Sequence, residues 1–160
     1  MVWYFFTVSS FLLGSLVFSG TLHAHELRPA VANVVVTETE VEIKLLVNIE
    51  TILAGIDLAK VTDTDEAPEA KFYDQLRSLS ADELARLVES EWINLEKGML
   101  VDGADRFRLQ SVKVLEEKNV ELPRDTIVEM IAKLKLGAGP VAIGWVKKNG
   151  NLVVRHGNGE

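Results

Sequence analysis

The chain has 160 residues, 24 of them acidic and 17 basic, and a formal net charge of −7. An acidic balance of this size opposes the capture of nucleic acid or of anionic lipid headgroups, so we expect neither as a partner. Cysteine is absent. Disulfides and thiolate chemistry are therefore excluded, and burial of an apolar core must stabilise the fold.

Residues 1–24 are interpreted as a secretory signal peptide. Residues 1–20 carry no charged side chain and contain two apolar runs, which is typical of the hydrophobic part of an export signal. Cleavage after Ala24 gives a mature chain that begins at His25. No Lys or Arg precedes the apolar runs, and the alternative is an uncleaved N-terminal membrane anchor. Both readings place residues 25–160, one domain in length, in the periplasm or elsewhere outside the cytoplasm.

Alternation with a period of two predicts that the domain begins with a β-hairpin. Residues 30–36 and 41–47 are rich in Val, Ile and Leu, and four polar residues separate them. In the second segment the apolar residues alternate with Glu42 and Lys44. We therefore expect one buried face and one solvent-exposed face, as in an antiparallel sheet.

Helical spacing replaces this alternation between about residues 49 and 98. Apolar residues at positions 49, 52, 53 and 56 predict a short first helix. Pro68 suits the first turn of a second helix over residues 69–79, in which Phe72, Leu76 and Leu79 form the expected buried stripe.

A third helix is predicted after Ser80. Ser80 and Glu83 have the spacing of a capping box, in which each side chain bonds the other residue's backbone amide. The apolar stripe of this helix comprises Leu84, Leu87, Val88, Trp92 and Leu95. Gly98 is expected to end it, because glycine tolerates the left-handed conformation of a helix cap.

Strand patterns return after Gly98. Residues 99–101, 107–114 and 126–136 are predicted strands, with a bulge near Ser111 where the alternation changes phase. Residues 141–147 and 152–156 are expected to pair across a type I′ turn at Asn149-Gly150. The fold class is therefore mainly β, an antiparallel β-sandwich or sheet, with the helical insertion between the second and third strands.

The first candidate site is a metal site at the mature N-terminus. A free N-terminal His25 can chelate copper or nickel through its amine and its ring nitrogen. Glu26 and His156 are the other expected ligands, provided that the first and last strands are neighbours. The alternative is that His25 is an exposed terminal residue and His156 an ordinary residue at a strand end.

Other chemical motifs favour binding over catalysis. The acidic residues Asp63, Asp65, Glu66 and Glu69 lack the pattern of a calcium loop, so we interpret them as a solvated loop before a helix. No Gly-x-Ser-x-Gly motif or phosphate-binding loop occurs. Trp92 and Trp145 are assigned to the core. We therefore expect a non-catalytic exported domain.

Five short segments carry a resemblance to a known family. They are residues 25–30, 53–57, 63–70, 122–125 and 139–141. Together they resemble the extracytoplasmic N-terminal region of bacterial HupE/UreJ-type membrane proteins, the hydrogenase/urease accessory family associated with nickel or cobalt uptake. Those proteins continue into several membrane helices, where their metal-handling residues are expected, so the resemblance assigns no metal ligand here.

The resemblance implies an accessory or binding domain of a metal-uptake system, with an inner-membrane transporter component as its partner. Two alternatives stay open at this point. The chain could serve as a periplasmic copper- or nickel-binding protein that uses an N-terminal histidine, or as a membrane-anchored interaction domain.

The metal hypothesis makes a chemical prediction. A chain that begins at His25 should bind copper(II) or nickel(II) more tightly than a chain extended by one residue, because the extension converts the amine ligand into an amide. His25→Ala should weaken binding in the same way, and binding should fall below about pH 6, where imidazole protonates. Isothermal titration of the three proteins measures this. Equal affinities would contradict a terminal chelate.

Overall fold

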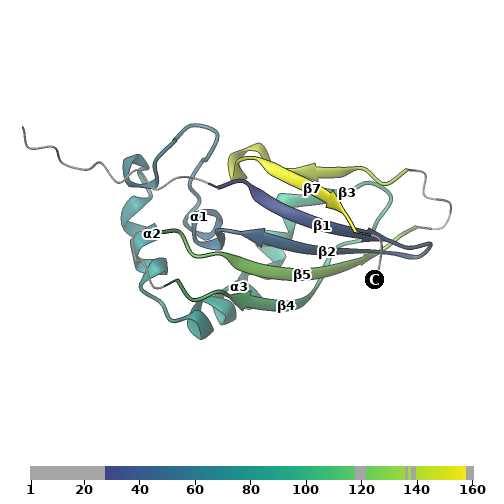
Figure 1. The fold of residues 1–160 in the computed structure, drawn as a ribbon, viewed down its shortest axis with the longest axis horizontal. Coiled ribbons are helices and arrows are strands. Elements are labelled where there is room, and N and C mark those ends of the chain that lie inside the picture. Colours follow the sequence, from purple (N-terminus) through teal and green to yellow (C-terminus); the bar gives the residue numbers. More distant parts are fainter. Residues whose placement is uncertain (1–27, 118–121, 136, 138–139, 158–160) are drawn as a thin grey trace, which may run out of the picture.

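The computed structural model describes residues 28–117, 122–135, 137 and 140–157. Within these residues a five-stranded sheet has the order β4-β5-β2-β1-β7, and β3 and β6 form a second, two-stranded sheet (Figure 1). The strands are β1 (Ala30–Val36), β2 (Glu40–Val47), β3 (Met99–Val101), β4 (Arg108–Val114), β5 (Thr126–Lys133), β6 (Ile143–Trp145) and β7 (Leu152–His156). The predicted sheet-dominated fold is confirmed.

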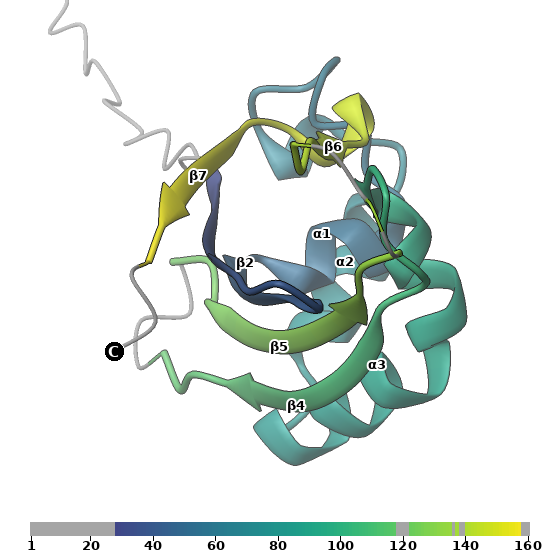
Figure 2. The same ribbon diagram turned by 90° about the vertical axis from the view of Figure 1, so that its right-hand side faces the viewer.

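Alternating side chains of the large sheet form the core. Val34 pairs with Ile43, and Ile43 pairs in turn with Met130, so one buried row crosses three strands. Figure 2 shows the sheet curving around this side, with β6 at the top of the view and the helices towards the right. Leu84 and Val88 of the third helix are fully buried in the same core. The period-two pattern therefore identified the buried face.

The helical insertion lies between β2 and β3, within the predicted bounds. It contains α1 (Ile49–Ala54), α2 (Ala70–Arg77) and α3 (Ala81–Leu95), together with the 3-10 turns η1 (Thr64–Glu66) and η2 (Glu96–Gly98). The predicted capping box begins α3, because the Ser80 hydroxyl accepts from the Glu83 amide and the Glu83 carboxylate accepts from the Ser80 amide. The predicted bulge is also confirmed, as a register shift between Leu109 and Ser111.

The predicted hairpin at Asn149-Gly150 is wrong. Residues Lys147–Asn149 form a 3-10 turn, η3, that carries the chain from β6 in the small sheet to β7 in the large one. A type I′ turn needs positive φ at both central residues, but only Gly150 has it, at 82°. β7 instead pairs with β1, and it does so in the parallel direction. The sheet is therefore mixed, with antiparallel pairing elsewhere.

Two details of the insertion also differ from expectation. Phe72 of α2 is 48% exposed, and its neighbour Tyr73 is buried in its place. Gly98 does not adopt a left-handed conformation. A Cβ atom there would lie 2.8 Å from the side-chain nitrogen of Asn149, so a larger residue would force that side chain to shift.

The predicted leader, residues 1–24, lies outside the described residues, as do His25 and Glu26. Within the described ranges, none of the helices combines the length and hydrophobicity needed to cross a bilayer.

The capping box should contribute stability that depends on pH. Ser80→Ala removes the N-cap and should cost about 1 kcal/mol. The hydrogen bonds from Ser80 lower the pKa of Glu83 below its ordinary value of 4.5. Stability from a lowered carboxyl pKa is present above the ordinary value and is lost as the pH falls through the folded-state value. Glu83→Ala should therefore be less stable than the parent at pH 7, with the difference shrinking in acid.

Urea unfolding from neutral to acidic pH measures this difference. Glu89→Ala, on the exposed side of the same helix, is the control and should differ little from the parent at any pH. A Glu83→Ala deficit that stays constant down to strongly acidic pH would contradict the linkage.

Candidate binding pocket

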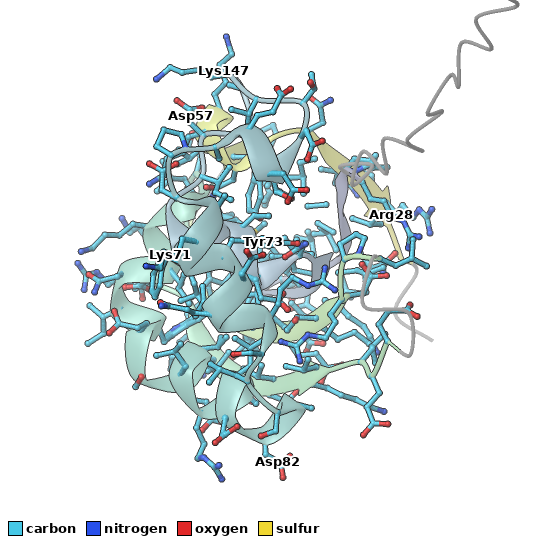
Figure 3. The ribbon with its side chains drawn as sticks, turned by 90° about the vertical axis from the view of Figure 1, so that its left-hand side faces the viewer. Arg28, Asp57, Lys71, Tyr73, Asp82 and Lys147 are labelled. Atoms are coloured by element: carbon cyan, nitrogen blue, oxygen red, sulfur yellow. The ribbon has the colours of Figure 1, made fainter. Side chains whose placement is uncertain are left out.

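A pocket of about 290 Å³ opens where the helical insertion leaves the large sheet. Its lining comes from the start of β1, the end of β2, α1, η1, α2, η3 and the segment before β5. Figure 3 looks onto this end of the molecule, with Tyr73 on the helical side and Arg28 on the strand side. We call it the β1–α2 pocket. Its volume is near the lower end of the range for small-molecule sites.

Apolar side chains make most of the walls. Val31 and Leu46 form a cross-strand pair between β1 and β2, and Pro29, Leu58 and Pro123 also line the pocket. Walls of this kind bind the apolar body of a ligand by removing it from water. Polar and charged side chains stand among them and would fix the orientation of a ligand.

One polar group is the hydroxyl of Tyr73, which is 1% exposed. The side-chain amide of Asn48 donates to it over 3.0 Å, and Arg77 donates to it over 3.4 Å. Asn48 is held in place because its carbonyl oxygen accepts from the backbone amide of Thr51 as the N-cap of α1. Both contacts of the Tyr73 oxygen are with donors. Its own proton is therefore available to an acceptor in the pocket.

A second polar group is the hydroxyl of Thr64, in η1. Thr64 is 0% exposed and lines the pocket, and its oxygen has no hydrogen-bond partner among the described residues. A buried hydroxyl without a partner costs free energy, since it loses its bonds to water. A ligand that reached this oxygen with a hydrogen-bonding group would supply the missing partner.

Charged groups stand at the mouth of the pocket. Arg28 and Asp125 approach to 3.6 Å, with side chains that are 54% and 29% exposed. This distance is too long for a hydrogen bond, so the guanidinium and the carboxylate keep their bonding capacity.

A buried ion pair holds two walls of the pocket together. Glu50 of α1 is 0% exposed and accepts from Arg124 over 2.8 Å. Arg124 also donates to the backbone carbonyls of Leu79 and Leu76, over 2.8 and 3.1 Å. Its sequence neighbours Pro123 and Asp125 line the pocket, and so does Thr51 beside Glu50. The pair therefore fixes α1 and α2 against the segment that precedes β5.

The structure places only one of the three predicted metal ligands. His156 is exposed at the end of β7 and lies beside Val34. The first and last strands are neighbours, as the metal hypothesis required, but they are parallel. His156 is therefore about 13 Å along β1 from Ala30, at the far end from the N-terminal side. In the described part of the chain, no cluster of three His, Asp or Glu side chains could hold a metal ion.

The other sequence interpretations agree with the structure. Asp65 and Glu66 are exposed, and Asp63 caps η1 by accepting from the Asp65 amide. Trp92 and Trp145 pack against the core, and their indole nitrogens donate to the carbonyls of Phe107 and Gly150.

The residues that build the pocket were not singled out from the sequence. Tyr73 is three residues before Leu76 and Phe72 is four residues before it, and both spacings place two side chains on one helix face. Spacing alone could therefore not choose between Tyr73 and Phe72. Glu50 and Arg124 are 74 residues apart, and no local pattern links them. A useful signal was Asn48 followed by Thr51, which reads as a helix N-cap with its first turn.

No protein-family model, curated protein or solved structure matches the chain.

The buried ion pair should be strongly coupled. Glu50→Leu or Arg124→Met alone leaves one charge buried without its partner and should cost about 3–5 kcal/mol of unfolding free energy. The double variant removes both charges and should lose clearly less than the sum of the two single variants. Urea unfolding monitored by tryptophan fluorescence measures all three. Additive losses in the double variant would contradict a direct pair.

Proposed function

We propose that this protein is an extracytoplasmic, non-catalytic binding domain whose site is the β1–α2 pocket. Its ligand is a small molecule with an apolar body and an uncharged hydrogen-bonding group. The single observation that carries the proposal is Thr64, a fully buried residue of the pocket lining whose hydroxyl has no hydrogen-bond partner among the described residues. A buried polar group without a partner calls for an explanation, and a bound ligand would supply one at a residue that lines a pocket.

The chemistry of the lining supports binding over catalysis. The described lining contains no histidine, and its one carboxylate, Asp125, stands beside Arg28. Asn48 and Arg77 bond the hydroxyl of Tyr73 as donors, so neither can act as a base toward it. These groups can recognise a ligand but supply no nucleophile–base pair.

The resemblance to the HupE/UreJ-type ectodomain supports the proposal that the domain is extracytoplasmic and non-catalytic. A domain of that kind would work beside an inner-membrane transporter component, with the leader directing it to the periplasm. Nickel or cobalt as the transported species is implied by the resemblance alone. The pocket itself has the lining of an organic ligand site.

Binding of para-cresol tests the proposal, because this molecule combines an apolar ring with one phenolic hydroxyl. Nuclear magnetic resonance titration should show shift changes confined to residues around the pocket. Leu46→Trp should abolish them by filling the pocket. Thr64→Val should weaken binding about tenfold, the size of one lost hydrogen bond, while leaving stability unchanged or raising it by about 1 kcal/mol.

Thr126→Val is the matched control. Thr126 is also fully buried, and its hydroxyl likewise has no partner among the described residues, but it does not line the pocket. Its substitution should affect stability in a similar way and leave para-cresol binding unchanged. Absence of binding in the parent, or equal loss in the two threonine variants, would overturn the proposal.

A further inference from the structure

We infer that the ligand of the β1–α2 pocket is a zwitterion of the amino-acid type with an uncharged side chain. This inference rests on the proposed function. Its evidence comes from the mouth of the pocket and not from the buried Thr64. The buried end of the pocket offers hydroxyl groups, whereas its mouth carries one charge of each sign, on Arg28 and Asp125.

The arrangement of the two charges selects for a ligand that carries both. The Arg28 and Asp125 side chains lie 3.6 Å apart, so each sits in the field of the other without a hydrogen bond between them. A ligand carboxylate alone would draw Arg28 away and leave Asp125 beside a new negative charge. A ligand ammonium alone would do the reverse to Arg28. A zwitterion can bond both groups and leaves neither charge uncompensated.

The chemistry of each contact fits an amino acid. The planar guanidinium of Arg28 matches a carboxylate, to which it can donate two parallel hydrogen bonds. Asp125 can accept from an ammonium group. The side chain of the ligand would then enter between Val31, Leu46 and Leu58 toward Tyr73 and Thr64. Neither Tyr73 nor Thr64 is charged, so the ligand's side chain is neutral.

The partial exposure of the charges is consistent with this role. Arg28 is 54% exposed and Asp125 is 29% exposed, so both can move to meet a ligand. Lys44 and Glu129 form a comparable pair on the sheet, with 54% and 44% exposure. They do not line the β1–α2 pocket, and they provide matched controls.

Three probes that share the para-cresol group test the inference. L-Tyrosine carries both charges, tyramine carries only the ammonium, and 3-(4-hydroxyphenyl)propanoate carries only the carboxylate. In nuclear magnetic resonance titrations of the parent protein, tyrosine should bind about tenfold more tightly than either single-charge probe, since each charge-assisted contact is strong.

Two substitutions should remove this preference selectively. Arg28→Gln should abolish the advantage of tyrosine over tyramine, because the carboxylate then has no cation to bind. Asp125→Asn should abolish the advantage of tyrosine over the propanoate. Lys44→Gln and Glu129→Gln, as controls, should leave all three affinities unchanged.

The outcomes separate this inference from the proposed function. Binding of para-cresol with equal affinities for the three charged probes would overturn the zwitterion and keep the pocket as the site. A propanoate that binds as tightly as tyrosine would also overturn it, since only Arg28 would then be used. Failure of every probe, para-cresol included, would overturn both.

Discussion

The guanidinium group of Arg124 is the constraint around which this end of the molecule is built. It donates to the Glu50 carboxylate on α1 and to two carbonyls, those of Leu76 and Leu79, where α2 ends. A cation near the C-terminal carbonyls of a helix is favoured by the helix dipole. One side chain therefore ties the first helix, the link between the second and third helices, and the start of a central strand.

Burial makes this connection both strong and demanding. Arg124 is 12% exposed and Glu50 is 0% exposed, so both charges have lost most of their contact with water. Attraction at short range offsets that loss only while the geometry is kept. One oxygen of Glu50 has no partner among the described residues, so the carboxylate depends on Arg124 for its bonding. The segments that carry the pocket walls are thus held to one arrangement.

The sequence predicted features that depend on local chemistry. Alternation in residues 41–47 identified the buried face of β2, and Ser80 with Glu83 located the start of α3, because each of these patterns involves neighbours in the chain. The sequence did not predict features that depend on contacts between segments far apart in the chain. Asn149-Gly150 is a good hairpin sequence, but the edge of β1 accepts β7 instead, and Gly98 is explained by the side chain of Asn149.

The candidate site was harder to predict than the fold for the same reason. Tyr73, Thr64 and Asn48 are unremarkable in sequence, and their proximity to one pocket follows from the return of the chain through α1, η1 and α2. His156 depends on distant segments in the same way. The metal hypothesis required the first and last strands to be neighbours, and the parallel direction of β7 decides which end of β1 the histidine accompanies.

The residues that line the pocket come from segments far apart in the chain, so ligand binding would affect the stability of the fold. Arg28 belongs to the start of the sheet, Tyr73 to the helical insertion and Asn149 to the turn before the last strand. A ligand in contact with all three would bridge segments that no disulfide can join, since the chain has no cysteine. Binding to the folded state alone raises stability by RT ln(1 + [L]/Kd). In the proposed complex, ligand binding would therefore stabilise the folded state, and the Thr64 hydroxyl, which has no partner among the described residues, is one group whose bonding a ligand could complete.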